Sequence, residues 1–172
     1  YPGCGVGGHC IPVDPYYLIK RAEKSGFDHK FLKMAREVNK GMPEYTIDLL
    51  IKELNKKEKS LKGTKVLLYG LSYKANVGDL RESPSLKLKK LLEKWETNYS
   101  VFDPYILDRS DFSSLDEALK FVEVVLIAAN HDEILRTDFS KYLNINLIVD
   151  GRNCLDKNKL PKNISYRGIG RC

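Results

Sequence analysis

The amino-acid sequence predicts a helical segment followed by an α/β domain built on a parallel sheet. From about Gly63 onward, short apolar runs alternate with stretches that open on helix-start signals, and the connections are short. This alternation is typical of a parallel sheet covered by helices on both faces. Before about Lys57 no run reads as a strand, and apolar residues recur at helical spacing instead. We therefore expect two domains, residues 1–60 and residues 61–172.

Length and composition limit the classes to which the chain can belong. Of its 172 residues, 42% are hydrophobic and 30% are charged, which is ordinary for a globular protein and argues against disorder. The longest apolar run, residues 122–129, is interrupted by Glu123 and is far shorter than the roughly 20 residues of a membrane span. No basic and apolar leader opens the chain, so we expect a soluble, cytoplasmic protein without membrane contacts. Because Tyr1 leads directly into a glycine-rich loop, we expect an N-terminal part of the protein to lie outside this sequence.

The net charge of +6 reflects 29 basic and 23 acidic residues, and much of the excess lies in residues 52–65, which hold six lysines. We interpret this stretch as a solvated helix end and linker. Nucleic-acid binding is not expected, because the stretch contains neither arginine nor aromatic residues. A phosphate-bearing small molecule is compatible with the charge. Four cysteines in such a chain do not indicate a disulfide framework.

Two helices are expected in the first domain. Asp14 and Pro15 look like an N-cap followed by proline at the first helical position, so we expect a helix over residues 16–25. A second helix starts at about Asp28, and Pro43 should kink or restart it. Its apolar stripe over residues 45–54 is too large for so small a domain to bury alone. We expect the missing N-terminal part, a second subunit, or both to cover it.

In the second domain we expect strands over residues 66–69, 99–102, 124–129, 147–150 and 164–167. Helices are expected after Ser83 and Pro84, after Ser114, which forms a capping box with Glu117, and over residues 132–142. Ligands of such sheets bind beyond the C-terminal ends of the strands. That rule points to residues 70–79, 103–104, 130–131 and 150–153.

The densest group of reactive residues lies in the glycine-rich stretch 3–15, where glycines permit close approach to a ligand and expose backbone amides. Cys10 is a candidate nucleophile, because it precedes a helix N-terminus, whose dipole favours a thiolate. Asp14 has two readings: it could orient a water or a base, or it could be only an N-cap. A rival interpretation is a zinc site formed by Cys4, His9 and Cys10, although a fourth ligand at suitable spacing is absent.

A second candidate site is the stretch 70–84, where a strand passes into a helix. Lys74 and Arg81 could each contact a phosphate, and Ser83 could cap the helix. The stretch has no G-K-[ST] signature of a P-loop, and no G-x-G-x-x-G follows a strand. The residues of the second domain therefore do not by themselves indicate a dinucleotide cofactor domain.

Four landmarks resemble segments of the UDP-glucose/GDP-mannose dehydrogenase family, and they follow the family's order over nearly the whole chain. They are residues 5–18, with the form Gly-His-Cys-Ile-Pro-Val-Asp-Pro, and residues 70–84, 150–153 and 166–170. The first is similar to the catalytic-cysteine segment of the branch that oxidises UDP-GlcNAc or UDP-ManNAc at C6. Val13 stands where UDP-glucose enzymes have lysine, which weakens a UDP-glucose assignment.

The resemblance implies the latter part of a NAD-dependent UDP-N-acetylhexosamine 6-dehydrogenase of polysaccharide biosynthesis. It implies a missing NAD-binding domain, a central helical segment that forms a homodimer through the stripe 45–54, and a Rossmann-like domain that binds the UDP-sugar. Cys10 would capture the C6 aldehyde as a thiohemiacetal, which a second oxidation turns into a thioester. Without the NAD-binding domain, the chain alone is expected to be inactive.

The same resemblance implies roles for individual residues. Asp14 matches a carboxylate that orients water, and Gly7 and Gly8 match backbone contacts to the sugar. The other matches are Tyr73 and Lys74 for the UDP-sugar, Arg152 for its pyrophosphate and Arg81 for NAD. Cys4 departs from the family pattern, in which we expect proline.

Two alternatives stay open on these residues. The whole chain could be a nucleotide-sugar-binding module without catalysis, although the Cys10 loop would then have no use. Arg152 could be structural, paired with a nearby carboxylate such as Asp150 or Asp156.

Overall fold

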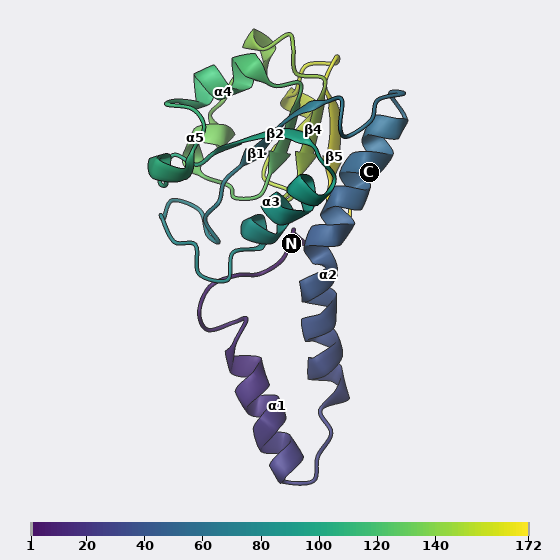
Figure 1. Cartoon of the computed structure of the whole chain (residues 1–172), viewed down its shortest axis with the longest axis vertical. Helices are drawn as coiled ribbons and strands as arrows, with labels where there is room; N and C mark the ends of the chain where they lie inside the picture. The colour runs from purple at the N-terminus through teal and green to yellow at the C-terminus, as the bar shows by residue number, and fades with distance from the viewer. Residues whose placement is uncertain (1, 172) are drawn as a thin grey trace.

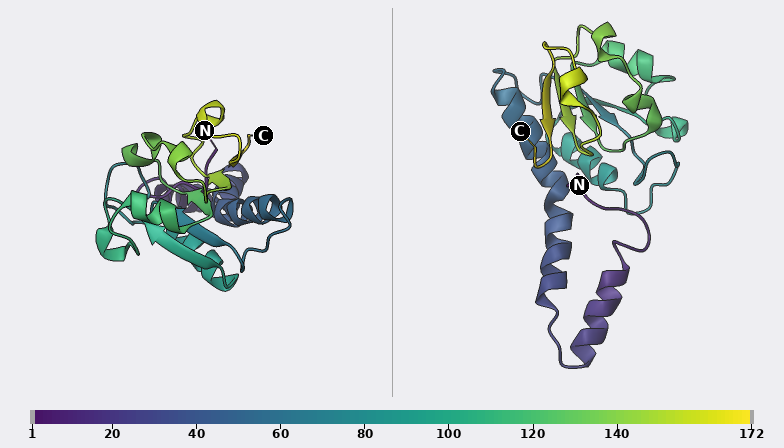
Figure 2. Two further views of the ribbon diagram at one scale, coloured as in Figure 1. Left: turned by 90° about the horizontal axis from the view of Figure 1, so that it is seen from above. Right: turned by 180° about the vertical axis from the view of Figure 1, so that it is seen from behind.

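A projecting pair of helices and a parallel α/β domain make up the computed structural model, which describes residues 2–171. Helix α1 (Asp14–Lys24) and helix α2 (Lys30–Asn55) run in opposite directions and form a hairpin that extends away from the sheet (Figure 1). The C-terminal half of α2 lies along the sheet domain, as the view from behind also shows (Figure 2). The predicted order, a helical segment followed by a parallel α/β domain, is confirmed.

The helix boundaries differ from the expected ones at two places. Helix α1 starts at Asp14, so Val13 occupies the N-cap position and no side chain caps the helix. Helix α2 continues through Pro43 without restarting. Pro43 is buried, and Lys87 Nζ donates a hydrogen bond to the carbonyl of Lys40 at 2.8 Å. Packing against the next helix therefore holds α2 together across the proline.

Five parallel strands form one sheet in the order β2-β1-β3-β4-β5. Their bounds are β1 (Lys65–Tyr69), β2 (Asn98–Phe102), β3 (Val124–Ile127), β4 (Leu147–Asp150) and β5 (Ser165–Gly168). All five lie where the sequence predicts them, within two residues at each end. Because the chain moves to opposite sides of β1 to form β2 and β3, the point where the strand order reverses lies at the C-terminal ends of β1 and β3.

The two faces of the sheet have separate cores, because successive strand side chains point to opposite sides. On one face, Val66 and Leu68 of β1 pack with Leu50 and Leu54 of α2 and with helix α3 (Pro84–Lys94). On the other, Leu67 of β1 packs with helix α4 (Leu115–Phe121) and with helix α5 (Asp132–Leu135). Helices therefore cover both faces, as predicted.

The prediction of one helix over residues 132–142 is wrong. Helix α5 ends after one turn at Leu135, and a separate 3₁₀ turn, Phe139–Lys141, follows. The break occurs because the carboxylate of Asp138 accepts hydrogen bonds from the amide and the hydroxyl of Ser140, which competes with helix continuation.

The caps of the other two helices follow the sequence more closely. Ser83 accepts a hydrogen bond from the amide of Ser85 and so caps α3. Ser114 caps α4 by accepting from the amide of Glu117. The reciprocal bond of the predicted capping box is shifted by one residue, because the Glu117 carboxylate accepts from the amide of Ser113 instead.

Apart from Tyr45, which is 41% exposed, the stripe over residues 45–54 is not available to a second subunit, which corrects the expected dimer surface. Ile47, Leu50 and Leu54 are buried within this chain, because α2 packs onto its own sheet domain. The exposed apolar row of α2 lies nearer its N-terminus, at Phe31 and Met34.

The lysine-rich stretch 52–65 is largely solvated, as predicted. Four of its six lysines are exposed. Lys59 and Lys62 form ion pairs with Glu123 and Glu96. Within residues 2–171, no helix is both long enough and apolar enough to cross a membrane.

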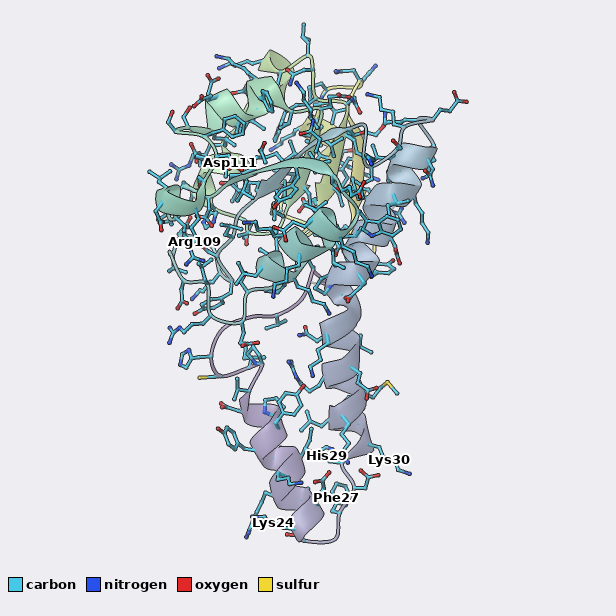
Figure 3. All side chains as sticks on the ribbon, viewed as in Figure 1. Lys24, Phe27, His29, Lys30, Arg109 and Asp111 are labelled. Atoms are coloured by element: carbon cyan, nitrogen blue, oxygen red, sulfur yellow. The ribbon has the colours of Figure 1, made fainter. Side chains whose placement is uncertain are left out.

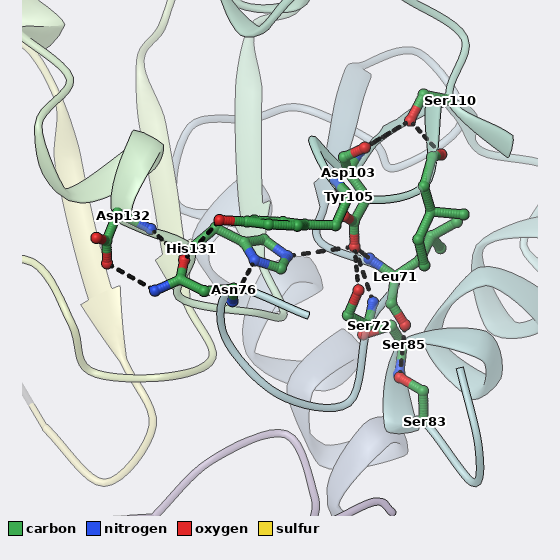
Figure 4. A network of polar contacts seen from close by, with 11 residues as sticks. Leu71, Ser72, Asn76, Ser83, Ser85, Asp103, Tyr105, Ser110, His131 and Asp132 are labelled. Atoms are coloured by element: carbon green, nitrogen blue, oxygen red, sulfur yellow. Dashed lines mark hydrogen bonds and ion pairs between the residues drawn. The ribbon is translucent and has the colours of Figure 1, made fainter. Parts of the chain in front are cut away.

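A carboxylate at the end of β2, that of Asp103, fixes the start of the loop that follows β1. Its Oδ2 atom accepts hydrogen bonds from the amides of Leu71 and Ser72 at 2.7 and 2.9 Å, and from the Ser72 hydroxyl at 2.8 Å (Figure 4). The amide of Tyr105 donates to Oδ1 at 2.8 Å. Burial alone would raise the pKa of Asp103, but these bonds, together with one from His131, lower it to about 2.

We predict that Asp103 accounts for part of the loss of stability in acid. Its pKa is about 2 in the folded state against an ordinary 3.8, so its carboxylate stabilises the fold above pH 3.8, and that contribution is lost as the pH falls through about 2. Between pH 5 and pH 2, the free energy of unfolding in urea should fall by about 2 kcal/mol less in Asp103→Asn than in the wild type.

The control for this prediction is Asp108→Asn, which changes an exposed carboxylate in the same region. It should reproduce the pH dependence of the wild type. The same pH dependence in Asp103→Asn and the wild type would contradict the prediction.

Candidate functional site

The glycine-rich segment 2–10 lies across the C-terminal ends of the central strands. The amide of Cys4 donates to the carbonyl of Gly151, directly after β4, at 3.0 Å. The amide of Gly8 donates to the carbonyl of Arg81, in the loop between β1 and α3, at 2.9 Å. From there the chain continues into α1, below the sheet in Figure 1. The predicted cysteine loop and two of the predicted ligand-binding loops therefore meet at one edge of the sheet.

Asn39 of α2 holds the middle of this segment. Its Oδ1 atom accepts from the amide of Val6 at 2.9 Å, and its Nδ2 atom donates to the carbonyl of the same residue at 3.4 Å. No local pattern points to this contact, because the two residues are 33 positions apart. The only signal is an amide side chain between the apolar residues Val38 and Met42 of a helix.

Gly7 and Gly8 lie against the aromatic ring of Tyr73. A Cβ atom on Gly7 would stand 2.6 Å from the carbonyl oxygen of Glu82 and 2.7 Å from Cβ of Tyr73. Gly8 has a φ of +96°, and a Cβ atom there would stand 3.0 Å from the Tyr73 ring. Neither position admits a larger residue without a shift of backbone or ring. Three residues expected to contact the sugar nucleotide are thus in direct contact with each other.

Cys10 and Asp14 are both exposed and line one surface pocket of about 440 Å³, together with Ile11, Pro15 and Leu18. The amide of Asp14 donates to the carbonyl of Cys10 at 2.8 Å, which fixes the spacing of the two residues. Because the Asp14 side chain caps no helix, the N-cap reading is wrong. Its carboxylate is free to act beside the candidate nucleophile.

Two cations border Tyr73 in the loop between β1 and α3. Lys74 is exposed, and its ammonium group has no partner among the described residues. Arg81 pairs with Asp79, with 2.6 Å between Nη2 and Oδ2. Hydrogen bonds from Arg81 lower the pKa of Asp79, so this pair stays charged over a wide pH range.

Arg152 lines a cavity of about 540 Å³ between segment 2–10 and α2. Its guanidinium Nη1 atom lies 3.5 Å from the carbonyl oxygen of Gly5. In the described part of the chain it pairs with no carboxylate, so neither Asp150 nor Asp156 is its partner. Instead, the backbone amide of Arg152 donates to the Asp150 carboxylate at 2.9 Å.

That carboxylate is occupied by other donors. The amides of Cys154 and Leu155 donate to Asp150 Oδ2 at 2.8 and 2.9 Å, and the hydroxyl of Tyr166 donates to it at 3.0 Å. Asp150 thus organises the loop after β4, and the guanidinium of Arg152 is left to face the cavity.

Cys4 fills a buried position beneath the segment. Its side chain is fully buried, and its Sγ atom lies 3.6 Å from the carbonyl oxygen of Ala128. Burial raises the pKa of this thiol, against the opposing effect of the nearby Arg152. Cys10, in contrast, is on the surface. Within residues 2–171, no three histidine, cysteine, aspartate or glutamate side chains are grouped as metal ligands.

The loop after β1 does not fit a dinucleotide. Its glycine pattern is absent, since Gly70 is followed by Leu71 and Ser72. The amides of those two residues donate to Asp103. The residues that follow β1 therefore do not form a glycine-rich dinucleotide site.

The chain is similar to known proteins over nearly its whole length. A model of the UDP-glucose/GDP-mannose dehydrogenase family, UDP binding domain, matches residues 67–157, and a model of the family's central domain matches residues 1–41. The UDP-N-acetyl-D-mannosamine dehydrogenase of Pyrococcus horikoshii is 32% identical over 99% of this chain and 40% of its own length. The protein of the same name from Methanococcus vannielii is 34% identical over 94% of this chain and 38% of its own length.

Solved structures of similar proteins have the same fold over nearly the whole of this chain. The UDP-D-ManNAc dehydrogenase from Pyrococcus horikoshii superimposes with a TM-score of 0.88 over 99% of this chain and 40% of that one. The NDP-N-acetyl-D-galactosaminuronic acid dehydrogenase from Methanosarcina mazei is 28% identical, with a TM-score of 0.87 over 99% of this chain and 39% of that one. The chain spans about 40% of the length of these relatives. Since the UDP-binding domain alone matches more than half of the chain and the central domain matches its first helices, the chain belongs to the UDP-glucose/GDP-mannose dehydrogenase family.

Proposed function

We propose that the chain is the central and UDP-sugar-binding portion of a NAD-dependent UDP-N-acetylhexosamine 6-dehydrogenase that serves polysaccharide biosynthesis. In this proposal, residues 1–60 are the central segment and residues 61–172 bind the UDP-sugar. One observation supports it: segment 2–10, which ends at the candidate nucleophile Cys10, docks on the sheet edge, with Gly7 and Gly8 against Tyr73 and the carbonyl of Gly5 3.5 Å from Arg152 Nη1. The names of the relatives favour UDP-ManNAc over UDP-GlcNAc as the substrate.

The chemistry follows from the two exposed side chains of the pocket. The Cys10 thiolate adds to the C6 aldehyde carbon, a C–S bond forms, and the carbonyl oxygen takes up a proton to give a thiohemiacetal. This covalent capture keeps the aldehyde in the site between two oxidations. Asp14 orients the water that later hydrolyses the thioester, which releases a carboxylate and the free thiol. NAD, when bound, accepts the hydrides of both oxidations.

We predict that Cys10 forms this adduct without cofactor. When UDP-ManNAc 6-aldehyde labelled with ¹³C at C6 is added to the chain, the NMR signal of C6 should move to the range of a carbon bonded to both sulfur and oxygen. In Cys10→Ser the signal should stay that of the free aldehyde and its hydrate. Cys154→Ser is the control, because burial raises the pKa of the Cys154 thiol and makes it a poor nucleophile.

The alternative, a nucleotide-sugar-binding module without catalysis, gives a different result in the same experiment. The labelled compound would bind, yet its C6 signal would be the same for the wild type and Cys10→Ser. That outcome would contradict the dehydrogenase proposal.

Binding of the nucleotide is tested at Arg152. A guanidinium can form two parallel hydrogen bonds with pyrophosphate oxygens, whereas an ammonium group cannot. By calorimetry, Arg152→Lys should weaken UDP binding by about 1–3 kcal/mol, the range of a hydrogen bond to a charged group. The fold should survive, because the side chain borders a cavity and not the core. The control is Arg109→Lys, because Arg109 is an exposed arginine near the end of β2; this variant should bind UDP like the wild type. Equal affinities for UDP in Arg152→Lys and the wild type would show that Arg152 is structural.

We also propose a homodimer, through the exposed apolar residues of α2 from Phe31 to Tyr45 and not through Ile47, Leu50 and Leu54, the buried residues of the stripe first expected. Phe31, Met34, Val38 and Tyr45 are between 41% and 81% exposed. With Gly41 they follow one another at alternating steps of three and four residues, which is the spacing of a helix-pairing seam. The same seam on a second copy is its natural complement.

Light scattering should therefore give twice the 19.7 kDa mass of the chain. Phe31→Asp should give the single mass, because it places a charge in the seam. Leu143→Asp changes an 85% exposed leucine of the sheet domain and should leave the dimer intact. A wild-type monomer at high concentration would rule the dimer out.

A further inference from the structure

His131, four residues after the end of β3, is fully buried and hydrogen-bonded on both ring nitrogens. Its Nδ1 atom accepts from the amide of Asn76 at 2.9 Å, and its Nε2 atom lies 3.2 Å from Oδ2 of Asp103 (Figure 4). Since Nδ1 accepts a hydrogen bond, it carries no proton, and Nε2 is the donor to the carboxylate. The neutral imidazole therefore links the end of β2 to the turn of the loop after β1.

The same turn is held by two further contacts. Asn76 Nδ2 donates to Asp132 Oδ1 at 2.9 Å, and the amide of Asp132 donates back to Asn76 Oδ1 at 3.0 Å. Asn76 adopts a φ of +59°, a left-handed conformation that a side chain other than glycine seldom takes without support. The support comes from residues 131–132 and from the hydroxyl of Tyr105, which donates to Asn76 Oδ1 at 3.5 Å, and not from within the loop.

The opposite side of this loop faces the cysteine segment. Tyr73, three residues before Asn76, contacts the backbones of Gly7 and Gly8, and its amide donates to the carbonyl of Asp79 at 3.0 Å. The loop 71–79 is therefore held between the buried His131 contacts and segment 2–10. We expect a change on the Asn76 side to shift the position of Tyr73 and Lys74, the two residues that match UDP-sugar contacts of the family.

We propose that His131 is a positioning residue for nucleotide-sugar recognition: by accepting the Asn76 amide it holds loop 71–79 in the form that binds the sugar nucleotide. This inference rests on the proposed function. A purely structural histidine would affect only the stability of the fold. A positioning histidine also affects affinity, because the apparent affinity falls with the fraction of molecules whose loop is in the binding form.

Two substitutions separate the two hydrogen bonds of the ring. Asn places an oxygen where Nδ1 stands, so His131→Asn keeps the acceptor for the Asn76 amide. Gln places a nitrogen near Nε2, so His131→Gln keeps the donor to Asp103 but loses that acceptor. Both remove a buried ring and should lower the free energy of unfolding to a similar degree. By calorimetry, His131→Gln should bind UDP roughly fivefold to tenfold more weakly than the wild type, as expected for one lost hydrogen bond, and His131→Asn within about twofold of it.

The matched control is His29→Gln, because His29 lies at the far tip of the α1–α2 hairpin (Figure 3). It should bind UDP like the wild type. If the wild type binds UDP and the two His131 variants do not differ from each other in their affinity for UDP, the positioning role is wrong and the proposed function stands. If the wild type binds no UDP, the proposed function fails, and this inference fails with it.

A second measurement covers the case in which the variants do not fold. In the wild type, ¹⁵N chemical shifts of the His131 ring should show the tautomer with the proton on Nε2. The amide of Asn76 should exchange slowly with deuterium. A ring protonated on Nδ1, or fast exchange at Asn76, would overturn the proposal without any variant.

Discussion

Three backbone amides at alternate positions determine how the parts of this chain relate to each other. The amides of Cys4, Val6 and Gly8 each donate a hydrogen bond to a different element: to the loop after β4, to helix α2 and to the loop after β1. Segment 2–10 thus pairs with its surroundings as an extended strand would, although it belongs to no sheet. Because each bond reaches a different element, the segment fixes where the surface residue Cys10 stands relative to the sheet edge.

Helix α2 supports this arrangement, because one half of it packs on the sheet and the other half projects beyond it. Its C-terminal half buries Leu50 and Leu54 against the sheet, which supplies the hydrophobic free energy that holds the helix in place. Its N-terminal half projects from the sheet and exposes Phe31 and Met34. Asn39 lies between the two halves and holds Val6 by two hydrogen bonds. One helix therefore carries both the contact to segment 2–10 and the exposed apolar seam.

The sequence predicts the sheet well, because buried parallel strands are continuous apolar runs that end at glycine or aspartate. Residues 66–69 and 147–150 show this pattern without interruption. It predicts the burial of single helix faces less well. The stripe 45–54 is plainly apolar, but no pattern shows whether its partner is another subunit or the sheet of the same chain. Pro43 signals a break that packing against α3 overrides.

For the site, the position of a residue at a strand end is more informative than its type. The rule that ligands bind beyond the strand ends points to the segments that contain Asp103, His131 and Arg152, and the structure places all three at that edge. The rule cannot show that Asp103 binds the neighbouring loop and not a ligand, because the answer depends on which amides face the Asp103 carboxylate. Asn39 could not be predicted as a site residue either, because its role depends on its contact with Val6, 33 positions away.

The docking of segment 2–10 can be measured directly by amide hydrogen exchange, residue by residue, in the 172-residue chain. The amides of Cys4, Val6 and Gly8 have acceptors, whereas those of Gly5, Gly7 and His9 have none among the described residues. Exchange should therefore be slow at the first three positions and fast at the intervening ones. Uniformly fast exchange from Cys4 to His9 would contradict the docking of the cysteine segment on the sheet, and with it the placement of Cys10 at the candidate site.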